Sequence, residues 1–141
     1  MKRIVLRMVL LATAAVLTAT SCPRLAWADA PPDRVVVMYF HRTERCPTCR
    51  KMGSYSEEAV DAAFAEQRKL RVVEFHYVDF QDEKNAKLTA GYKISGPALI
   101  VAKIVDTKVA EYEDLEGIWD KVADKEAFLL YVQQQIAAYR E

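Results

Sequence analysis

The sequence is poor in glycine, histidine and cysteine, and each shortage argues against a class of function. Only four of the 141 residues are glycine, and they form no glycine-rich pattern of the kind that binds a dinucleotide. The two histidines, His41 and His76, lie at spacings from the cysteines that are unlike any usual zinc ligand set. We therefore expect no separate cofactor and no zinc site.

The chain also lacks an excess of charge of either sign, with 20 Lys+Arg against 20 Asp+Glu. Residues 1–28 hold four of these bases and no acid, which leaves 16 bases against 20 acids in the rest. A nucleic acid or an anionic membrane needs a clustered basic face. We expect neither as a partner, and the length predicts one domain.

No apolar run is long enough to cross a bilayer, which takes about 20 residues. The longest near the N-terminus, residues 8–19, has twelve, and it follows the basic residues Lys2, Arg3 and Arg7. A small-x-small motif, Ala-Trp-Ala, ends at Ala28. This order is typical of a secretory signal peptide. We predict cleavage after Ala28 and a periplasmic or otherwise extracytoplasmic protein.

Cys22 offers an alternative within the signal, because a cysteine soon after an apolar run can be acylated in a lipoprotein. The residue three positions before it is Ala19 rather than the usual leucine, and Pro23 follows it. The simpler interpretation is that Cys22 is discarded with the signal. We expect contact with a membrane only if Cys22 carries a lipid.

The rest of the chain alternates between strand and helix patterns. Residues 29–33 are a flexible lead-in, and residues 34–141 form the domain. Strands are predicted at 34–41, 70–80, 98–105 and 109–112, and helices at 46–69 with a break near Gly53, at 82–92, and at 115–140 with a break near Asp124.

The predicted order is therefore β-α-β-α-β-β-α. A capping-box pattern at residues 54–57 restarts the first helix. Strands separated by helices are expected to run parallel, and the short turn at Asp106 adds an antiparallel hairpin. The expected fold class is α/β, with a mixed four-stranded sheet flanked by helices.

A Cys-Pro-Thr-Cys motif lies where the first strand ends and a helix begins, at Cys46 and Cys49. Two thiols in an oxidising compartment can form a disulfide, and no odd thiol remains after signal removal. Backbone amides and the positive end of the dipole at a helix N-terminus favour a thiolate. Cys46, nearer to solvent, is the expected nucleophile, and Cys49 is the expected resolving thiol.

Charged neighbours strengthen this expectation. Arg45 and Arg50 flank the pair, and nearby cations lower the pKa of a thiol. His41 is a titratable neighbour that could tune the thiolate, or alternatively a strand-end residue with a structural hydrogen bond. The sequence offers two other interpretations of the cysteines: an inert disulfide that staples a turn, and half of a zinc site, which the spacings of His41 and His76 disfavour.

The element order with this motif after the first strand resembles a thioredoxin-like domain. In that fold a cis-proline precedes the third core strand, and Pro97 matches this position. The resemblance implies a cis Gly96–Pro97 bond, with the Gly96 backbone pairing to an extended substrate. The alternative is an ordinary trans proline. Thioredoxins have Trp where Arg45 stands, and an acid on the first strand that this chain lacks.

Several segments further resemble the ArsF-type family, which consists of small exported thioredoxin-like proteins labelled as subunits of a nitrophenyl-compound nitroreductase. The matching segments are residues 39–43, 45–51, 57–60, 118–119 and 128–132. Nitroreduction normally needs flavin, for which the sequence has no binding pattern. The resemblance therefore implies a dithiol electron relay to a separate reductase subunit.

The function predicted is that of a thiol-disulfide oxidoreductase whose partner is a protein or small-molecule disulfide or dithiol. The Cys46–Cys49 disulfide is its only expected redox group. A first alternative is a protein that binds arsenite or copper(I) through the same two thiolates. A second is a catalytically silent accessory subunit that docks a partner through the face carrying the motif.

Overall fold

The computed structural model describes residues 31–141. The predicted signal peptide, its Cys22 and the first residues of the lead-in lie outside the described residues. None of the helices within residues 31–141 is long and apolar enough to span a bilayer.

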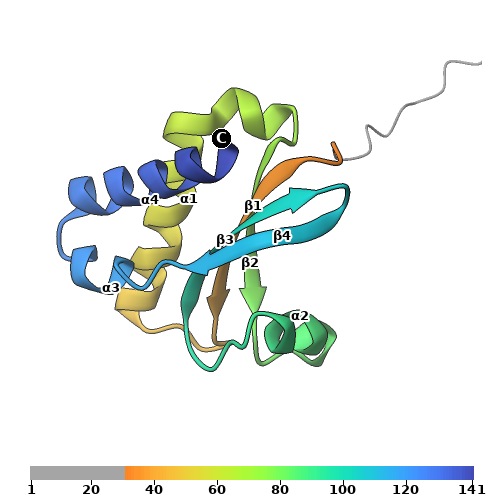
Figure 1. Cartoon of the computed structure of the whole chain (residues 1–141). Coiled ribbons are helices and arrows are strands. Elements are labelled where there is room, and N and C mark those ends of the chain that lie inside the picture. The colour runs from red at the N-terminus through yellow and green to blue at the C-terminus, as the bar shows by residue number, and fades with distance from the viewer. Residues whose placement is uncertain (1–30) are drawn as a thin grey trace, which may run out of the picture.

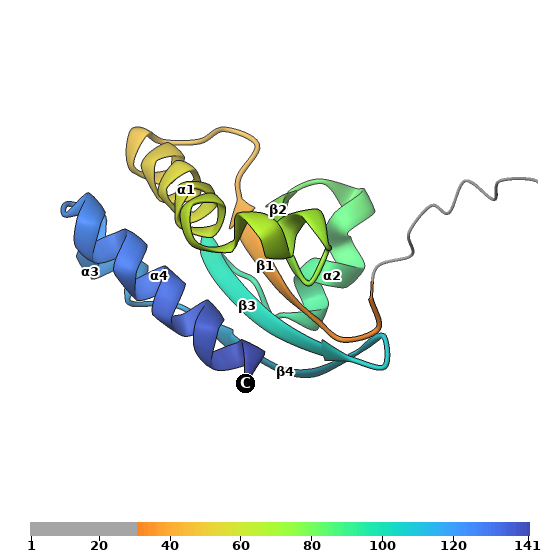
Figure 2. The same ribbon diagram turned by 90° about the horizontal axis from the view of Figure 1, so that it is seen from above.

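Four strands form one sheet in the order β2-β1-β3-β4. Helices α1, α3 and α4 lie on one face of this sheet and α2 on the other (Figures 1 and 2). In chain order the elements are β1 (Arg34–His41), α1 (Pro47–Lys69), β2 (Val73–Asp79), the 3-10 helix η1 (Glu83–Asn85), α2 (Ala86–Gly91), β3 (Ala98–Val105), β4 (Lys108–Asp114), α3 (Ile118–Lys121) and α4 (Lys125–Arg140). The predicted α/β class with a mixed four-stranded sheet is confirmed.

Strand β1 lies at the centre and is buried on both faces, which explains its unbroken apolar sequence. Val35, Val37 and Tyr39 pack into the core under α1 and α4. The alternate residues pack into a second cluster on the α2 face: Val36, Met38 and Phe40. A strand in this position has side chains fixed on both faces, so its end is a firm base for the loop that follows.

The prediction that helix-separated strands run parallel is correct for β1 with β2 but wrong for β1 with β3. The latter pair is antiparallel, with Tyr39 opposite Leu99. A parallel crossover must return along the whole strand, usually through a helix of matching length. Helix α2 has six residues, which span only about 9 Å. The chain therefore turns back, and β3 begins at the end of the sheet where β2 finishes.

Helix α1 is continuous where a break was predicted. Gly53 lies inside it, and the only non-helical backbone angles occur later, at Phe64. The predicted capping box is wrong, because Ser54 and Glu57 both lie inside the continuous helix, and the Glu57 carboxylate accepts from the Tyr77 hydroxyl at 3.0 Å instead.

The remaining boundaries differ little from those predicted. Strand β2 begins at Val73 because the Val72 N–H donates to the Gln67 carbonyl and closes α1. The break near Asp124 is confirmed, since its carboxylate accepts from the Ala127 N–H at 3.1 Å and caps α4. The predicted hairpin turn is also confirmed, at Asp106 and Thr107, both with positive φ.

Replacing Phe128 by Ala should lower the free energy of unfolding by about 3–5 kcal/mol, because the side chain is fully buried and its removal leaves a cavity. Leu130→Ala, on the same helix but 51% exposed, should change it by only about 0.5 kcal/mol. Urea denaturation of both variants measures the difference. Equal losses would contradict the burial of Phe128 in the core.

Candidate active site: the disulfide at the start of helix α1

Cys46 ends the loop that leaves β1 and is the N-cap residue of α1, and Pro47 is the first helical residue. Cys46 and Cys49 are joined as a disulfide, with their Cα atoms 5.1 Å apart. The Cys49 N–H also points at the Cys46 sulfur, at 3.1 Å. The predicted location of the motif, at a strand-to-helix junction, is therefore observed. The first turn of α1 thus directs one of its free backbone amides, that of Cys49, at the Cys46 sulfur.

The two sulfurs differ in access to solvent. Cys46 is exposed, whereas Cys49 is buried, with a relative exposure of 9%. A substrate can therefore approach Cys46 but not Cys49. This is the geometry that the predicted roles of nucleophile and resolving thiol require.

Tyr39 on β1 binds the first turn of α1 from the sheet side. Its hydroxyl, at the buried end of β1, donates to the Cys49 carbonyl at 2.7 Å. Burial raises the pKa of Tyr39 to about 12, although the nearby Arg45 charge opposes the rise. The hydroxyl therefore stays a neutral donor at ordinary pH. Sequence reasoning missed this role, because Tyr39 has the pattern of any core residue in a buried strand.

A second tyrosine extends this support to the neighbouring strand. The Tyr77 ring contacts that of Tyr39 edge to face, with centroids 6.2 Å apart, and its hydroxyl donates to Glu57 at 3.0 Å. Burial and the Glu57 carboxylate raise the pKa of Tyr77 to about 12. Alternation along β2 does place Tyr77 on the α1 face, but nothing in the sequence pairs it with Glu57.

Gly53 is what lets α1 approach these two rings. A Cβ at this position would lie 2.9 Å from ring atoms of both Tyr39 and Tyr77. The glycine that suggested a helix break is therefore a contact point between α1 and the sheet.

The arginines that were expected near the motif are held by aromatic rings and backbone. The Arg45 guanidinium lies over the Tyr77 ring at 5.4 Å, and Arg42 lies over Phe80 at 5.7 Å. The Arg50 Nε donates to the Arg45 carbonyl at 3.0 Å. Both flanking residues, Arg45 and Arg50, are thus brought to the disulfide end of the domain.

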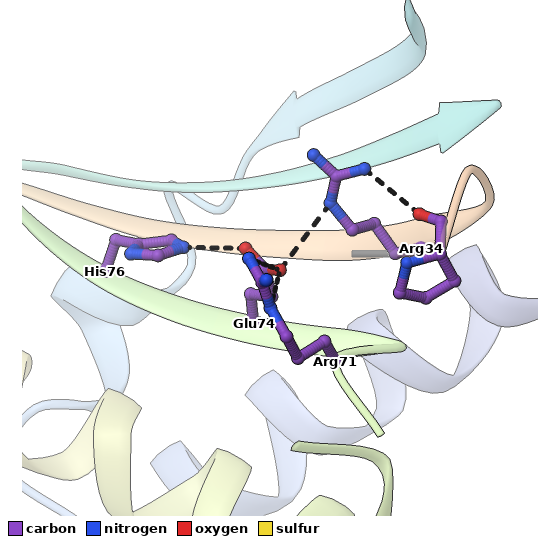
Figure 3. A network of polar contacts seen from close by, with 5 residues as sticks. Arg34, Arg71, Glu74 and His76 are labelled. Carbon is purple, nitrogen blue, oxygen red and sulfur yellow. Dashed lines mark hydrogen bonds and ion pairs between the residues drawn. The ribbon is translucent and has the colours of Figure 1, made fainter. Parts of the chain in front are cut away.

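His41 has the structural contacts of the alternative interpretation. Its Nδ1 lies 2.9 Å from the Arg42 carbonyl oxygen, and its ring packs near Tyr39 and Tyr77. Within residues 31–141 it makes no hydrogen bond to either cysteine. His76 is exposed on β2 and pairs with Glu74 (Figure 3). The described part of the chain contains no cluster of three or more His, Cys, Asp and Glu residues that could hold a metal.

The loop before Cys46 is fixed to the end of β2 through Thr43. Its hydroxyl donates to Asp79 at 2.7 Å and its N–H donates to the Gln81 side chain at 3.1 Å. The hydrogen bond from Thr43 holds the pKa of Asp79 below its usual value. These residues are far apart in the sequence, so their pairing depends on the parallel register of β1 and β2.

Pro97 lies directly before β3, whose first residue, Ala98, is opposite Phe40 on β1. Gly96 and Pro97 therefore lie at the sheet end from which the chain leads to Cys46. The prediction of a cis Gly96–Pro97 bond is wrong, because residues 31–141 contain no cis peptide bond. The trans form is intrinsically favoured by about 0.5–1 kcal/mol, and a proline before a strand needs no N–H partner. Space is open beside Gly96.

No family model and no curated protein matches the chain. Among solved structures it is similar to a cysteine-to-serine mutant of Entamoeba histolytica thioredoxin, with 20% identity, coverage of 72% of this chain and 82% of that one, and a TM-score of 0.42. It is also similar to a Thermus thermophilus thioredoxin, with 22% identity, 72% and 73% coverage, and a TM-score of 0.41.

The fold assignment rests on the topology of this chain. Three features together define the fold: the sheet order β2-β1-β3-β4, the single parallel pair at β1 and β2, and a disulfide at the start of the helix after β1. The domain has the thioredoxin-like fold that the element order predicted.

Replacing Gly53 by Ala should lower the free energy of unfolding by about 1–3 kcal/mol, because the new methyl group overlaps the Tyr39 and Tyr77 rings. Gly91→Ala is the matched control, since no atom lies within 4 Å of its added Cβ. It should leave stability unchanged or raise it by about 0.4–1 kcal/mol. Chemical denaturation measures both, and a neutral Gly53→Ala would contradict the close contact.

The two tyrosines predict a loss of stability in alkali. Their pKa is about 12 in the folded protein against 10.0 for the free side chain, so the folded state holds the phenol proton more tightly. This contribution is complete below pH 10 and is lost as the pH rises towards 12. Absorbance at 295 nm should show their ionisation near pH 12. Tyr77→Phe should remove one equivalent of tyrosine ionisation from the transition near pH 12 and none from the transition near pH 10.

Proposed function

We propose that the protein is a thiol-disulfide oxidoreductase that works through Cys46 and Cys49. The observation that carries the proposal is the difference in access between the two linked sulfurs, with Cys46 exposed at a helix N-terminus and Cys49 buried one turn away. An inert disulfide that staples a turn has no need of this asymmetry. A redox pair needs it, because only one sulfur should meet the substrate.

The exchange proceeds in two steps from the reduced dithiol. The Cys46 thiolate attacks a substrate sulfur, which breaks the substrate S–S bond, forms a mixed disulfide and releases one thiolate. Cys49 then attacks the Cys46 sulfur, so the mixed disulfide breaks and the second thiolate leaves. Two electrons pass to the substrate, and the Cys46–Cys49 disulfide remains. The reverse order of the same steps oxidises a substrate dithiol.

The surroundings of the pair favour the first step. The helix amides and the charges of Arg45 and Arg50 stabilise a thiolate at Cys46. No carboxylate within residues 31–141 forms a hydrogen bond to either cysteine, so the second step has no fixed base. The proton of Cys49 is then taken by the departing substrate thiolate or by water.

Several finer features belong to the same proposal. The predicted export signal supports an extracytoplasmic location, and the open backbone at Gly96 beside Pro97 supports a place for an extended substrate. The sequence resemblance to the ArsF-type family supports a role as an electron relay to a separate reductase subunit. In each case the support comes from residues of this chain.

Replacing Cys49 by Ser tests the proposal, because the mixed disulfide can then form at Cys46 but cannot be resolved. The variant should accumulate a covalent adduct with a model disulfide, seen as a mass increase on intact-protein mass spectrometry and reversed by dithiothreitol. Cys46→Ser is the matched control and should form no adduct under the same conditions.

Adduct formation by neither variant would overturn the proposal. A dithiol that binds arsenite or copper(I) should instead lose metal affinity in both variants, which equilibrium dialysis would detect. If the adduct forms, the equilibrium of the pair with glutathione then gives the direction of electron flow. A potential near that of thioredoxin, about −270 mV, indicates a reductant, and one near −120 mV an oxidant.

A further inference from the structure

Four basic residues lie close to the exposed Cys46 in the sequence, and we call them the cationic rim: Arg42, Arg45, Arg50 and Lys51. None of the four forms an ion pair within residues 31–141. They lie on the loop before Cys46 and within the first five residues of α1. Their charge is therefore available to whatever molecule approaches Cys46.

A cluster at the other end of the sheet shows the contrasting arrangement. There Arg34 and Arg71 lie 3.7 and 3.1 Å from the Glu74 carboxylate, and His76 contacts it from the other side (Figure 3). That acid is largely buried among them, so the arginines are neutralised in place. Two arginines thus have a carboxylate partner at Glu74, whereas the rim has none.

Two acids on neighbouring elements keep their negative charge, but their hydrogen-bond donors are neutral groups rather than the side chains of the rim. Asp79 accepts from Thr43 and Gln81, and Glu57 accepts from Tyr77. Glu44 is the only acid between residues 42 and 51, against four bases in the same segment. The segment 42–51, which carries both cysteines, therefore has an excess of three positive charges, although the domain as a whole carries more acids than bases.

The arginines of the rim are also held in place before any ligand arrives. Ring contacts fix Arg42 and Arg45, and the bond to a backbone carbonyl fixes Arg50. A guanidinium presents a planar fork that matches a carboxylate, and one that is already ordered loses less entropy on binding. This combination is suited to recognising carboxylate groups.

We propose that the substrate is an anionic disulfide, with carboxylates close enough to its sulfur atoms to reach the cationic rim while Cys46 attacks. This rests on the proposed function and adds the substrate class. The chemistry is shared by a small disulfide that carries carboxylates and by a polypeptide disulfide flanked by Asp or Glu.

The test follows oxidation of the pre-reduced protein by three small disulfides of different charge. Glutathione disulfide is anionic, hydroxyethyl disulfide is neutral and cystamine is cationic. Acid quenching, alkylation and mass spectrometry report the fraction of Cys46–Cys49 that has been oxidised, so the readout is the same for all three. Each rate constant is divided by that of the same disulfide with free dithiothreitol. We expect this relative rate constant to be highest for glutathione disulfide, intermediate for hydroxyethyl disulfide and lowest for cystamine.

Substitutions then assign the preference to the rim. Arg42→Gln, Arg45→Gln and Arg50→Gln should each lower the ratio of the glutathione to the cystamine rate. Two unit charges about 6 Å apart in water attract enough for roughly a threefold effect on one rate, and so more on the ratio. Loss of an arginine also changes the Cys46 thiol itself. The ratio cancels that change, because it affects all three disulfides alike.

Lys108→Gln is the matched control for loss of one charge. Lys108 pairs with Val105 at the far end of β3, seven residues from Ala98, which is about 23 Å along the strand. This exceeds the Debye length of about 10 Å at 0.1 M salt. The control should leave the ratio unchanged, and 0.5 M NaCl should reduce it in the unmodified protein.

The outcomes separate this inference from the function on which it rests. Suppose that hydroxyethyl disulfide oxidises the protein and that glutathione disulfide and cystamine react at equal relative rates. This result would overturn the inference of an anionic substrate and leave the proposed oxidoreductase function intact. Failure to react with all three would overturn the oxidoreductase itself. A preference that survives the three arginine substitutions would remove the rim as its source.

Two peptide disulfides of equal length, with Asp or Lys beside the cysteine, distinguish the sources of the carboxylates. A polypeptide substrate is indicated if the Asp peptide reacts faster than glutathione disulfide. A small-molecule substrate is indicated if glutathione disulfide reacts faster. Faster reaction of the Lys peptide than of the Asp peptide would contradict the inference.

Discussion

The close approach of α1 to the sheet at Gly53 is the constraint on which the rest of the site depends. Without a side chain at this position, the helix lies against the Tyr39 and Tyr77 rings. Tyr39 is then near enough to bind the Cys49 carbonyl, and Tyr77 lies where Arg45 covers its ring. One missing Cβ thus sets the height of the helix above the sheet and the position of both cysteines.

This contact also gives the two tyrosines different roles. Tyr39 is buried, and its hydroxyl binds the backbone carbonyl of Cys49, the proposed resolving residue. It therefore fixes the position of Cys49 without placing a charge beside it. Tyr77 lies nearer the surface and joins Glu57 to the face that carries Arg45. The interior of the site is therefore neutral and rigid, whereas its rim is charged and open to solvent. A disulfide that must react on one side only is well served by this separation.

The short connection after β2 has a comparable effect on the surroundings of Cys46. Because α2 is too short to carry the chain back along the sheet, β3 starts at the end where β1 and β2 finish. Three features consequently lie at the same end of the sheet: the loop after β1, the Thr43 contacts with the end of β2, and the Gly96–Pro97 segment. A longer crossover would have placed Pro97 at the opposite end of the domain.

Local patterns were sufficient for the elements and for the reactive pair. The unbroken apolar sequence of β1, the proline after Cys46 and the cap at Asp124 act within a few residues, so the sequence by itself determined a strand, a helix start and a helix break. The spacing of Cys46 and Cys49 likewise determined the disulfide. The tertiary structure decided the direction of β3, the trans bond before Pro97, and the contacts of Tyr39, Thr43 and Arg45. Each depends on residues distant in the sequence, which meet only after the strands have taken their register.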